Sequence, residues 1–493
     1  MSPLFRLPRE LRDIIYDFYI RCDGGYVYNA ETQKFRRADG DPISCALALT
    51  CRQAASELEG LAFQVNPITF SSTPISSLRE QVALHHEVAC AFAENGYFLI
   101  SQTGRFLVTQ EMRERVAEAY PQFAPYLEIW LKERVLGDRW GWEWDYTVGE
   151  ARSIWCDFQR FLAQLISRHP ALHETIKALP ANSGIYMPSV DLLQRDDINF
   201  EPWRIYDKTE LERLSNMLSF CPIPWGRIHP ETKLTYSAAS TALQFLNKCT
   251  RKVRKHIRKI ILIENKVLTG RSESYGRGFI PFCRENRCLH VERRVNLWRT
   301  VFGPTSGDQA TYTFGWTEWD ARQFKNERLR ARDVTRSVGK WMTEALALPS
   351  LGMPEESYTL VFDGNPVPEL SSKVFRIIQR DAAWQAALDA CYSRGLFPEV
   401  SWQIGRRQNK CYQFEGLPEV MQMLLTGSSS LIQCNFDLGA PYDVEQILED
   451  HRGWDWATWS ESWSSHEPST FQTEPPLPPW HKWCWKQYYG YYD

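Results

Sequence analysis

Residues 4–19 read LFRLPRELRDIIYDFY, and this stretch predicts a short amphipathic helix. Pro8 suits the first helical turn, because its missing N–H has no partner there and its φ is already helical. Glu10 lies near the helix N-terminus, where negative charge is favoured. The apolar residues recur at i, i+3, i+4 and i+7, which places them on one stripe: Leu11, Ile14, Ile15 and Phe18.

The following residues predict a hairpin, a second helix and a short strand. Residues 22–43 read as a β-hairpin in which 26–28 face 34–36 across a polar turn. Residues 44–63 predict a helix that carries Leu47, Cys51, Ala54, Leu58 and Leu61 on one side. Asn66-Pro67 breaks the chain, and residues 68–70 then read as a short extended piece.

This order of motifs resembles the N-terminus of the F-box-like proteins that are numerous in filamentous fungi. Residues 7–16 (LPRELRDIIY) match the family's LPxELRxxIY helix. Residues 49–52 (LTCR) with Glu57-Leu58 match its second helix, and Asn66 with Phe70 matches its closing N-x-x-x-F. The resemblance covers residues 1–72. The hairpin at 22–43 departs from it as an insertion, where a compact F-box has a short loop.

The resemblance implies a function in ubiquitin ligation. Members of the family bind the Skp-type subunit of a cullin–RING ubiquitin ligase and so attach a substrate-binding region to it. A helix that binds in a partner groove is recognised by anchors at the spacing seen here. The predicted partner-binding residues are therefore Leu7, Pro8, Leu11, Ile14, Ile15 and Phe18. The alternative is that this stripe packs against the protein's own core.

The composition limits the other possibilities. The chain has 493 residues and a formal net charge of -3, so global charge does not point to nucleic acid or membrane. No apolar run is long enough to span a bilayer, and no signal-peptide core is present. The thirteen cysteines follow no disulfide framework. We expect reduced thiols and a cytoplasmic or nuclear location.

The fold class predicted for the whole chain is mixed α/β (α+β). Strand-like runs at 260–263 and 358–362 alternate with helices predicted at 238–257, 321–348 and 374–392. No repeat of fixed period exists, although such alternation suits an irregular solenoid. We divide the chain into an F-box-like unit (1–72), a mainly helical region (73–234), an α/β region (235–452) and a Trp/Pro-rich acidic tail (453–493), which we expect to pack back onto the body.

Residues 248–300 form a basic block, with fifteen Lys and Arg against four Asp and Glu. A helix within it carries the cations that could bind phosphate groups: Lys248, Arg251, Lys252, Arg254, Lys255 and Arg258. Alternatively, these charges pair with the acidic remainder of the chain. We expect pairing, and therefore no nucleic-acid binding.

Motifs for catalysis are absent from the sequence. Cys283, Cys288 and His290 lie close together, but zinc needs a fourth ligand and none is near in sequence. The chain has no G-x-S-x-G, no Walker loop and no G-x-G-x-x-G after a strand. We therefore expect no metal and no cofactor, and favour a non-catalytic protein–protein interaction protein. A phosphate- or nucleic-acid-binding protein and an enzyme of unfamiliar motif are the alternatives.

Overall fold

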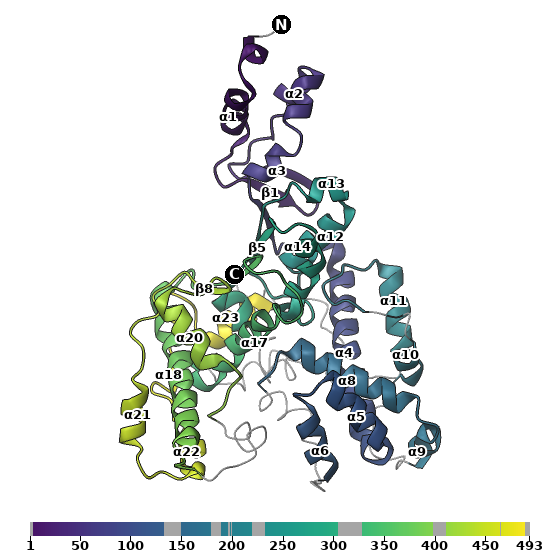
Figure 1. Ribbon diagram of the computed structural model, residues 1–493, viewed down its shortest axis with the longest axis vertical. Coiled ribbons are helices and arrows are strands. Elements are labelled where there is room, and N and C mark those ends of the chain that lie inside the picture. The colour runs from purple at the N-terminus through teal and green to yellow at the C-terminus, as the bar shows by residue number, and fades with distance from the viewer. Residues whose placement is uncertain are drawn as a thin grey trace.

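The computed structural model describes residues 3–132, 149–178, 189–195, 198, 200–218, 232–303, 328–397, 411–463 and 465–488. Helices surround one mixed sheet (Figure 1), and the predicted mixed α/β class is confirmed. Residues 133–148, which include Trp140, Trp142 and Trp144, and residues 219–231, just before the expected border at residue 235, lie outside the described residues.

Seven strands form the sheet, in the order β2-β1-β3-β4-β5-β7-β8. All neighbours are parallel except the hairpin pair β1 and β2. Apart from β2, each strand therefore adds to the same edge in chain order, as in a solenoid. The strands are β1 (Tyr26–Asn29), β2 (Lys34–Arg37), β3 (Ile68–Ser71), β4 (Lys259–Glu264), β5 (His290–Asn296), β7 (Tyr358–Asp363) and β8 (Ile432–Cys434).

Two asparagines, Asn296 at the end of β5 and Asn435 directly after β8, connect these strands to the residues that end or follow β7. Asn296 Nδ2 donates to the carbonyl of Asn365 at 2.7 Å. Asn435 Nδ2 donates to Asp363 Oδ1 at 2.6 Å, and its Oδ1 accepts from the Gly364 N–H at 2.8 Å. These bonds satisfy backbone groups where the ladder ends, which stabilises the carboxyl edge of the sheet.

The N-terminal elements project from one end of the molecule (Figure 1). They are η1 (Pro3–Arg6), α1 (Arg9–Ile20), η2 (Leu47–Leu49), α2 (Arg52–Glu57) and α3 (Leu61–Val65). The single helix predicted at 44–63 is wrong, because the chain breaks twice. Cys51 is extended and caps α2, and Gly60 takes a left-handed φ of +74° before α3.

The hairpin at 22–43 is present and belongs to the main sheet. Tyr28 pairs with Phe35 across β1 and β2, and Tyr26 pairs with Ile68 of β3. Since Ile68 and Phe70 of β3 are buried in the main core, the N-terminal region shares its core with residues 235–452. The border at residue 72 therefore crosses one continuous sheet.

The helical region at 73–234 packs around the long helix α4. Its second half contributes Leu99, Ile100 and Leu107 to an apolar cluster with Trp155, Phe158 and Leu162 of α8. The helices here are η3 (Ser76–Leu78), α4 (Arg79–Leu107), α5 (Gln110–Ala119), α6 (Ala124–Lys132), α8 (Arg152–Ser167), α9 (Leu172–Ala178), α10 (Val190–Gln194) and α11 (Lys208–Met217).

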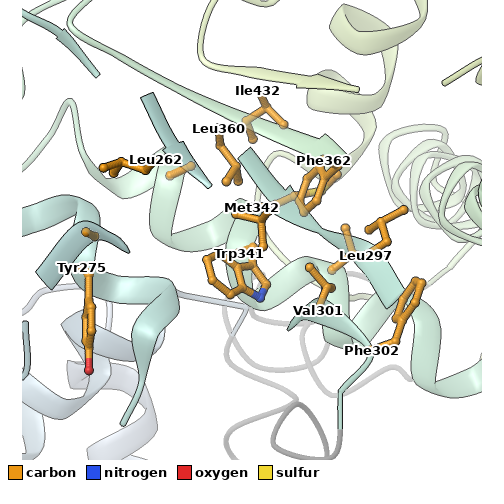
Figure 2. Packing of buried hydrophobic residues seen from close by; sticks show 14 of the residues in the cluster. Leu262, Tyr275, Leu297, Val301, Phe302, Trp341, Met342, Leu360, Phe362 and Ile432 are labelled. Carbon is orange, nitrogen blue, oxygen red and sulfur yellow. The ribbon is translucent and has the colours of Figure 1, made fainter. Parts of the chain in front are cut away.

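The main core lies under β3, β4, β5, β7 and β8. Figure 2 shows Leu262, Leu360 and Ile432 from three strands near Trp341 and Met342 of α17. The elements are α12 (Ala238–Lys248), α13 (Arg251–Arg254), η4 (Ser272–Phe279), α14 (Ile280–Glu285), η5 (Leu297–Val301), β6 (Leu329–Arg330), η6 (Ala331–Asp333), α17 (Val334–Ala347), α18 (Pro368–Ser393) and α20 (Leu417–Thr426).

Two predicted helices of this region have different bounds. The helix at 238–257 ends at Lys248, because Cys249 is extended and Thr250 caps the separate helix α13. The helix at 321–348 begins only at Val334, since residues 329–330 pair with the tail as a strand. Residues 321–327 lie outside the described part.

The tail packs back onto the body, as expected. Trp454, Trp459 and Trp463 join an apolar cluster with Trp384 and Leu388 of α18. Farther along, Leu477, Trp480 and Trp483 enter the main core. The helix α21 (Val444–Asp450) precedes the tail, whose elements are α22 (Trp456–Ser462), β9 (Thr470–Phe471) and α23 (Trp480–Tyr488).

Candidate functional site

The apolar stripe of α1 faces solvent. Leu11 is 47 % exposed, Ile14 54 % and Phe18 78 %, and Ile15 is also exposed. Of the two predicted residues before the helix, Pro8 is exposed and Leu7 is partly buried. The alternative, in which the stripe packs on the protein's own core, therefore does not describe this chain.

The polar face of α1 is the one that packs on the protein. Arg12 donates to both carboxylate oxygens of Glu57 in α2, at 2.7 and 2.9 Å. The buried Tyr16 hydroxyl donates to Glu57 Oε2 at 2.8 Å, and Gln53 donates to Oε1 at 3.0 Å. The hydrogen bond from Arg12 lowers the pKa of Glu57 to about 2. Glu57 is therefore ionised at neutral pH and holds α1 with its apolar side outward.

Asn66 fixes the end of α1 to the end of α3. Its side-chain oxygen accepts from the Cys22 N–H at 2.8 Å, and its amide donates to the carbonyls of Ile20 and Ala62 at 3.1 Å each. The Ile20 carbonyl is among the groups that the end of a helix leaves without an intrahelical partner. The asparagine of the N-x-x-x-F motif thus ties two helices together, while Phe70 anchors β3 in the main core.

The exposed apolar surface extends beyond the predicted residues. Leu49 is 82 % exposed and Tyr19 is exposed at 40 %. The Tyr19 hydroxyl contacts Ser44 Oγ at 2.9 Å and accepts from the Leu47 N–H at 3.2 Å, which joins α1 to η2. Sequence reasoning missed both residues. Leu49 is the first residue of the LTCR motif, but in the continuous helix predicted at 44–63 it did not lie on the apolar side. We call Leu11, Ile14, Ile15, Phe18, Tyr19 and Leu49 the α1 surface.

Contacts with α13 and the following residues hold this region against the body. Lys252 pairs with Glu59 at 2.5 Å, and Gln64 Nε2 lies 2.8 Å from His256 Nδ1. The Arg258 N–H donates to the Phe63 carbonyl at 3.2 Å. Together with the β3–β4 pairing, these bonds hold the base of the region, and α1 projects beyond it (Figure 1).

The basic residues predicted for anion binding do not lie on one helix, and several have acidic or polar partners. Arg254 binds Glu285 through two bonds of 2.8 and 2.9 Å, which lowers the pKa of that carboxyl. Arg251 lies 3.7 Å from Glu285, and Lys248 donates to Gln33 at 3.1 Å. Arg258 donates to the carbonyl of Lys255, an exposed residue that makes no ion pair in the described part of the chain.

The cysteines near His290 lack the geometry of a zinc site. Cys283 lies in the apolar core, and burial raises its pKa to about 12, whereas a metal ligand must be a thiolate. Cys288 is exposed, and His290 Nδ1 lies 2.6 Å from the carbonyl of Glu356. Within the described ranges, no three His, Cys, Asp or Glu residues come together in a group that could hold a metal ion.

A buried His–carboxylate pair joins the tail to α18. His466 Nε2 lies 3.1 Å from Asp381 Oδ1, and both side chains are almost fully buried. Arg380 and Thr335 donate to the same carboxylate at 3.0 and 2.6 Å. Such a pair suits general-base chemistry only where a substrate can reach it. Here both oxygens of the Asp381 carboxylate already have partners within the protein.

The comparisons with known proteins give no further identification: no family model, curated protein or solved structure matches this chain. Among the described residues, no helix is both long and apolar enough to cross a membrane.

Proposed function

We propose that this chain is a non-catalytic interaction protein that docks through the α1 surface on the Skp-type subunit of a cullin–RING ubiquitin ligase. The remainder of the molecule then serves to hold a protein substrate near the ligase. The resemblance of residues 7–16, 49–52 and 66–70 to F-box-like proteins supplies the partner's identity.

One observation carries the proposal: α1 turns its polar side inward and its apolar side to solvent. A surface helix normally does the opposite, because burying apolar area is the main gain in packing a helix. Contiguous exposed apolar residues of this kind mark interaction sites. Their i, i+3, i+4, i+7 spacing suits a helix that binds in a groove of its partner.

The test is calorimetric titration of the full chain with a recombinant Skp-type subunit. We expect Ile14→Asp and Phe18→Asp to abolish the binding heat, since each puts a charge into the buried centre of the interface. Both side chains are exposed in the free protein, so the melting temperature should stay within about 2 °C of wild type. Leu396→Asp is the matched control, because Leu396 is 64 % exposed outside the α1 surface.

Two results contradict the proposal. If the wild type does not bind the subunit, the partner assigned from the resemblance is wrong. If Ile14→Asp and Phe18→Asp bind as tightly as wild type, the docking surface lies elsewhere.

A further inference from the structure

Three cationic residues from different segments lie near the carboxyl ends of β4 and β5. Lys266 lies two residues beyond the end of β4, and Arg299 lies in the π-helical turn η5 directly after β5. Lys233 comes from the segment that leads into α12. This edge of a parallel sheet is where ligands of open α/β proteins bind.

Hydrogen bonds hold the three segments together. The Thr300 hydroxyl, adjacent to Arg299, donates to the carbonyl of Lys266 at 2.9 Å and to that of Glu264 at 3.1 Å. The Thr235 N–H, two residues after Lys233, donates to the Val267 carbonyl at 3.0 Å. These bonds fix the backbone positions from which the three side chains extend.

These cations lack the acidic partners that their neighbours have. Lys259 of β4 pairs with Glu292 at 2.6 Å, and the buried Arg293 of β5 pairs with Glu264 at 3.0 Å. By contrast, no described carboxylate pairs with Lys233, Lys266 or Arg299. Arg299 Nε is moreover buried and has no hydrogen-bond partner among the described residues.

The nearby positive charges affect the pKa of Lys266. Its pKa is lowered, first by burial and then by the positive charges of Arg299 and Lys233. Like charges held together without a counterion oppose folding, so the cluster is an electrostatic cost to the free protein. A bound dianion removes that cost and supplies an acceptor for the unpartnered Nε–H of Arg299.

We propose that Lys233, Lys266 and Arg299 bind the phosphate group of a phosphate monoester. The guanidinium group can bind two phosphate oxygens at once, and the two ammonium groups act as point charges. Three positive charges are better neutralised by a dianion than by a single carboxylate, which carries only one negative charge. The cluster holds three cations, whereas single-stranded nucleic acid needs a charged groove that follows its backbone. This site is distinct from the α1 surface and does not depend on the docking proposal.

The experiment is calorimetric titration of the full chain with inorganic phosphate at neutral pH and low ionic strength. We expect saturable binding that weakens about tenfold or more in Lys266→Gln and in Arg299→Gln. Arg299→Lys keeps the positive charge but cannot donate two hydrogen bonds from one planar group. Its affinity for phosphate should therefore lie between those of wild type and Arg299→Gln. The matched control is Lys373→Gln, which removes one exposed cation from α18 and should bind phosphate normally.

Thermal melting gives a second readout that separates this role from a structural one. In phosphate-free buffer, Lys266→Gln should melt at or above the wild-type temperature, because it removes a repelled charge. Added phosphate should raise the melting temperature of wild type and Lys373→Gln but not that of Lys266→Gln. Glucose 6-phosphate and O-phospho-L-serine then distinguish a sugar phosphate from a phosphorylated side chain as the source of the group.

Three results would overturn the site. The first is no saturable phosphate binding by the wild type at millimolar concentration. The second is unchanged affinity in both Lys266→Gln and Arg299→Gln. The third is a loss of binding in Lys255→Gln that matches the loss in Arg299→Gln, which would place the anion at α13.

Discussion

Glu57 accepts hydrogen bonds from Arg12, Tyr16 and Gln53, and at the residue scale these contacts orient α1. They bring the polar side of the helix against α2 and leave the opposite stripe in water. The contact depends on the ionised carboxylate, because a charge-assisted bond to Arg12 is stronger than a neutral one.

The first prediction is a pH dependence of α1 docking. The folded-state pKa of Glu57, about 2, lies below the ordinary glutamate value of 4.5. The stability it contributes is therefore present above pH 4.5 and lost as the pH falls toward 2. We expect α1 amides to exchange faster in Glu57→Gln than in wild type at pH 6, with the ratio approaching one at low pH. In that ratio the intrinsic pH dependence of exchange cancels. A ratio that stays constant with pH would refute this role of Glu57.

Glu344 of α17 has the opposite shift. Ser153 donates to its two carboxylate oxygens through the backbone N–H and the hydroxyl, at 2.7 Å each. Burial nevertheless raises the pKa of Glu344 to about 7. Between pH 4.5 and 7 the folded state holds a proton that the unfolded state has released, so stability falls as the pH rises through this interval.

The second prediction follows from that sign. Glu344→Gln can keep both contacts with Ser153, because the amide oxygen accepts from the N–H and the amide nitrogen donates to the hydroxyl. It should raise the free energy of unfolding at pH 8 by about 3 kcal/mol and have little effect at pH 4. Urea denaturation at both pH values measures this difference. Equal effects at pH 4 and pH 8 would exclude titration of Glu344 as the cause.

At the scale of elements, turns decide how the N-terminal helices meet the body. Gly60 separates α2 from α3 with a φ of +74°. A Cβ built at Gly60 would come 2.2 Å from Cγ of His256, the residue whose ring contacts Gln64. The turn therefore needs glycine both for its backbone and for the close approach of residues 255–258.

The third prediction compares two glycines. Gly60→Ala should destabilise the protein by about 2 kcal/mol or more, since it adds a clash with His256 to the cost of a left-handed φ. Gly427→Ala is the control, because Gly427 has a φ of +65° and nothing within 4 Å of its Cβ position. It should lose only about 1 kcal/mol. Equal losses by chemical denaturation would show that the contact with His256 contributes nothing.

At the scale of the whole molecule, the tail completes the core that the sheet begins. The Trp483 indole N–H donates to the Trp298 carbonyl at 2.9 Å, in the buried layer next to η5. Residues 470–471 pair with residues 329–330 as a small separate sheet. Segments far apart in the chain therefore depend on one another, and we expect them to unfold together.

The fourth prediction tests this dependence. Trp483→Ala should cost about 3–5 kcal/mol, because it leaves a large cavity and an unpaired buried carbonyl. Trp456→Ala, at a tail position that is 37 % exposed, should cost less than about 1 kcal/mol. Denaturant titration of both variants measures the two losses. If Trp483→Ala is as mild as Trp456→Ala, the tail is not part of the cooperative core.

Local patterns in the sequence determined much of this molecule. The spacing of Leu11, Ile14 and Phe18 predicted α1, and the hairpin at 22–43 and the buried run at 260–263 were also predicted from their own residues. The period of a helix or strand can be recognised from a few consecutive residues, because the side chains on one face recur at a fixed interval in the sequence. The same spacing could not say whether that face meets a core or water.

Only the tertiary structure decided which surfaces are free. Arg12 meets Glu57 across 45 positions, and that pairing turns the apolar stripe of α1 outward. Arg254 likewise meets Glu285. The Thr300 hydroxyl donates to the Lys266 carbonyl and so brings residues 266 and 299 near each other, while no described carboxylate pairs with either cation. Burial and charge pairing depend on which distant segment packs against a residue, and that choice is made by the core and the sheet as a whole.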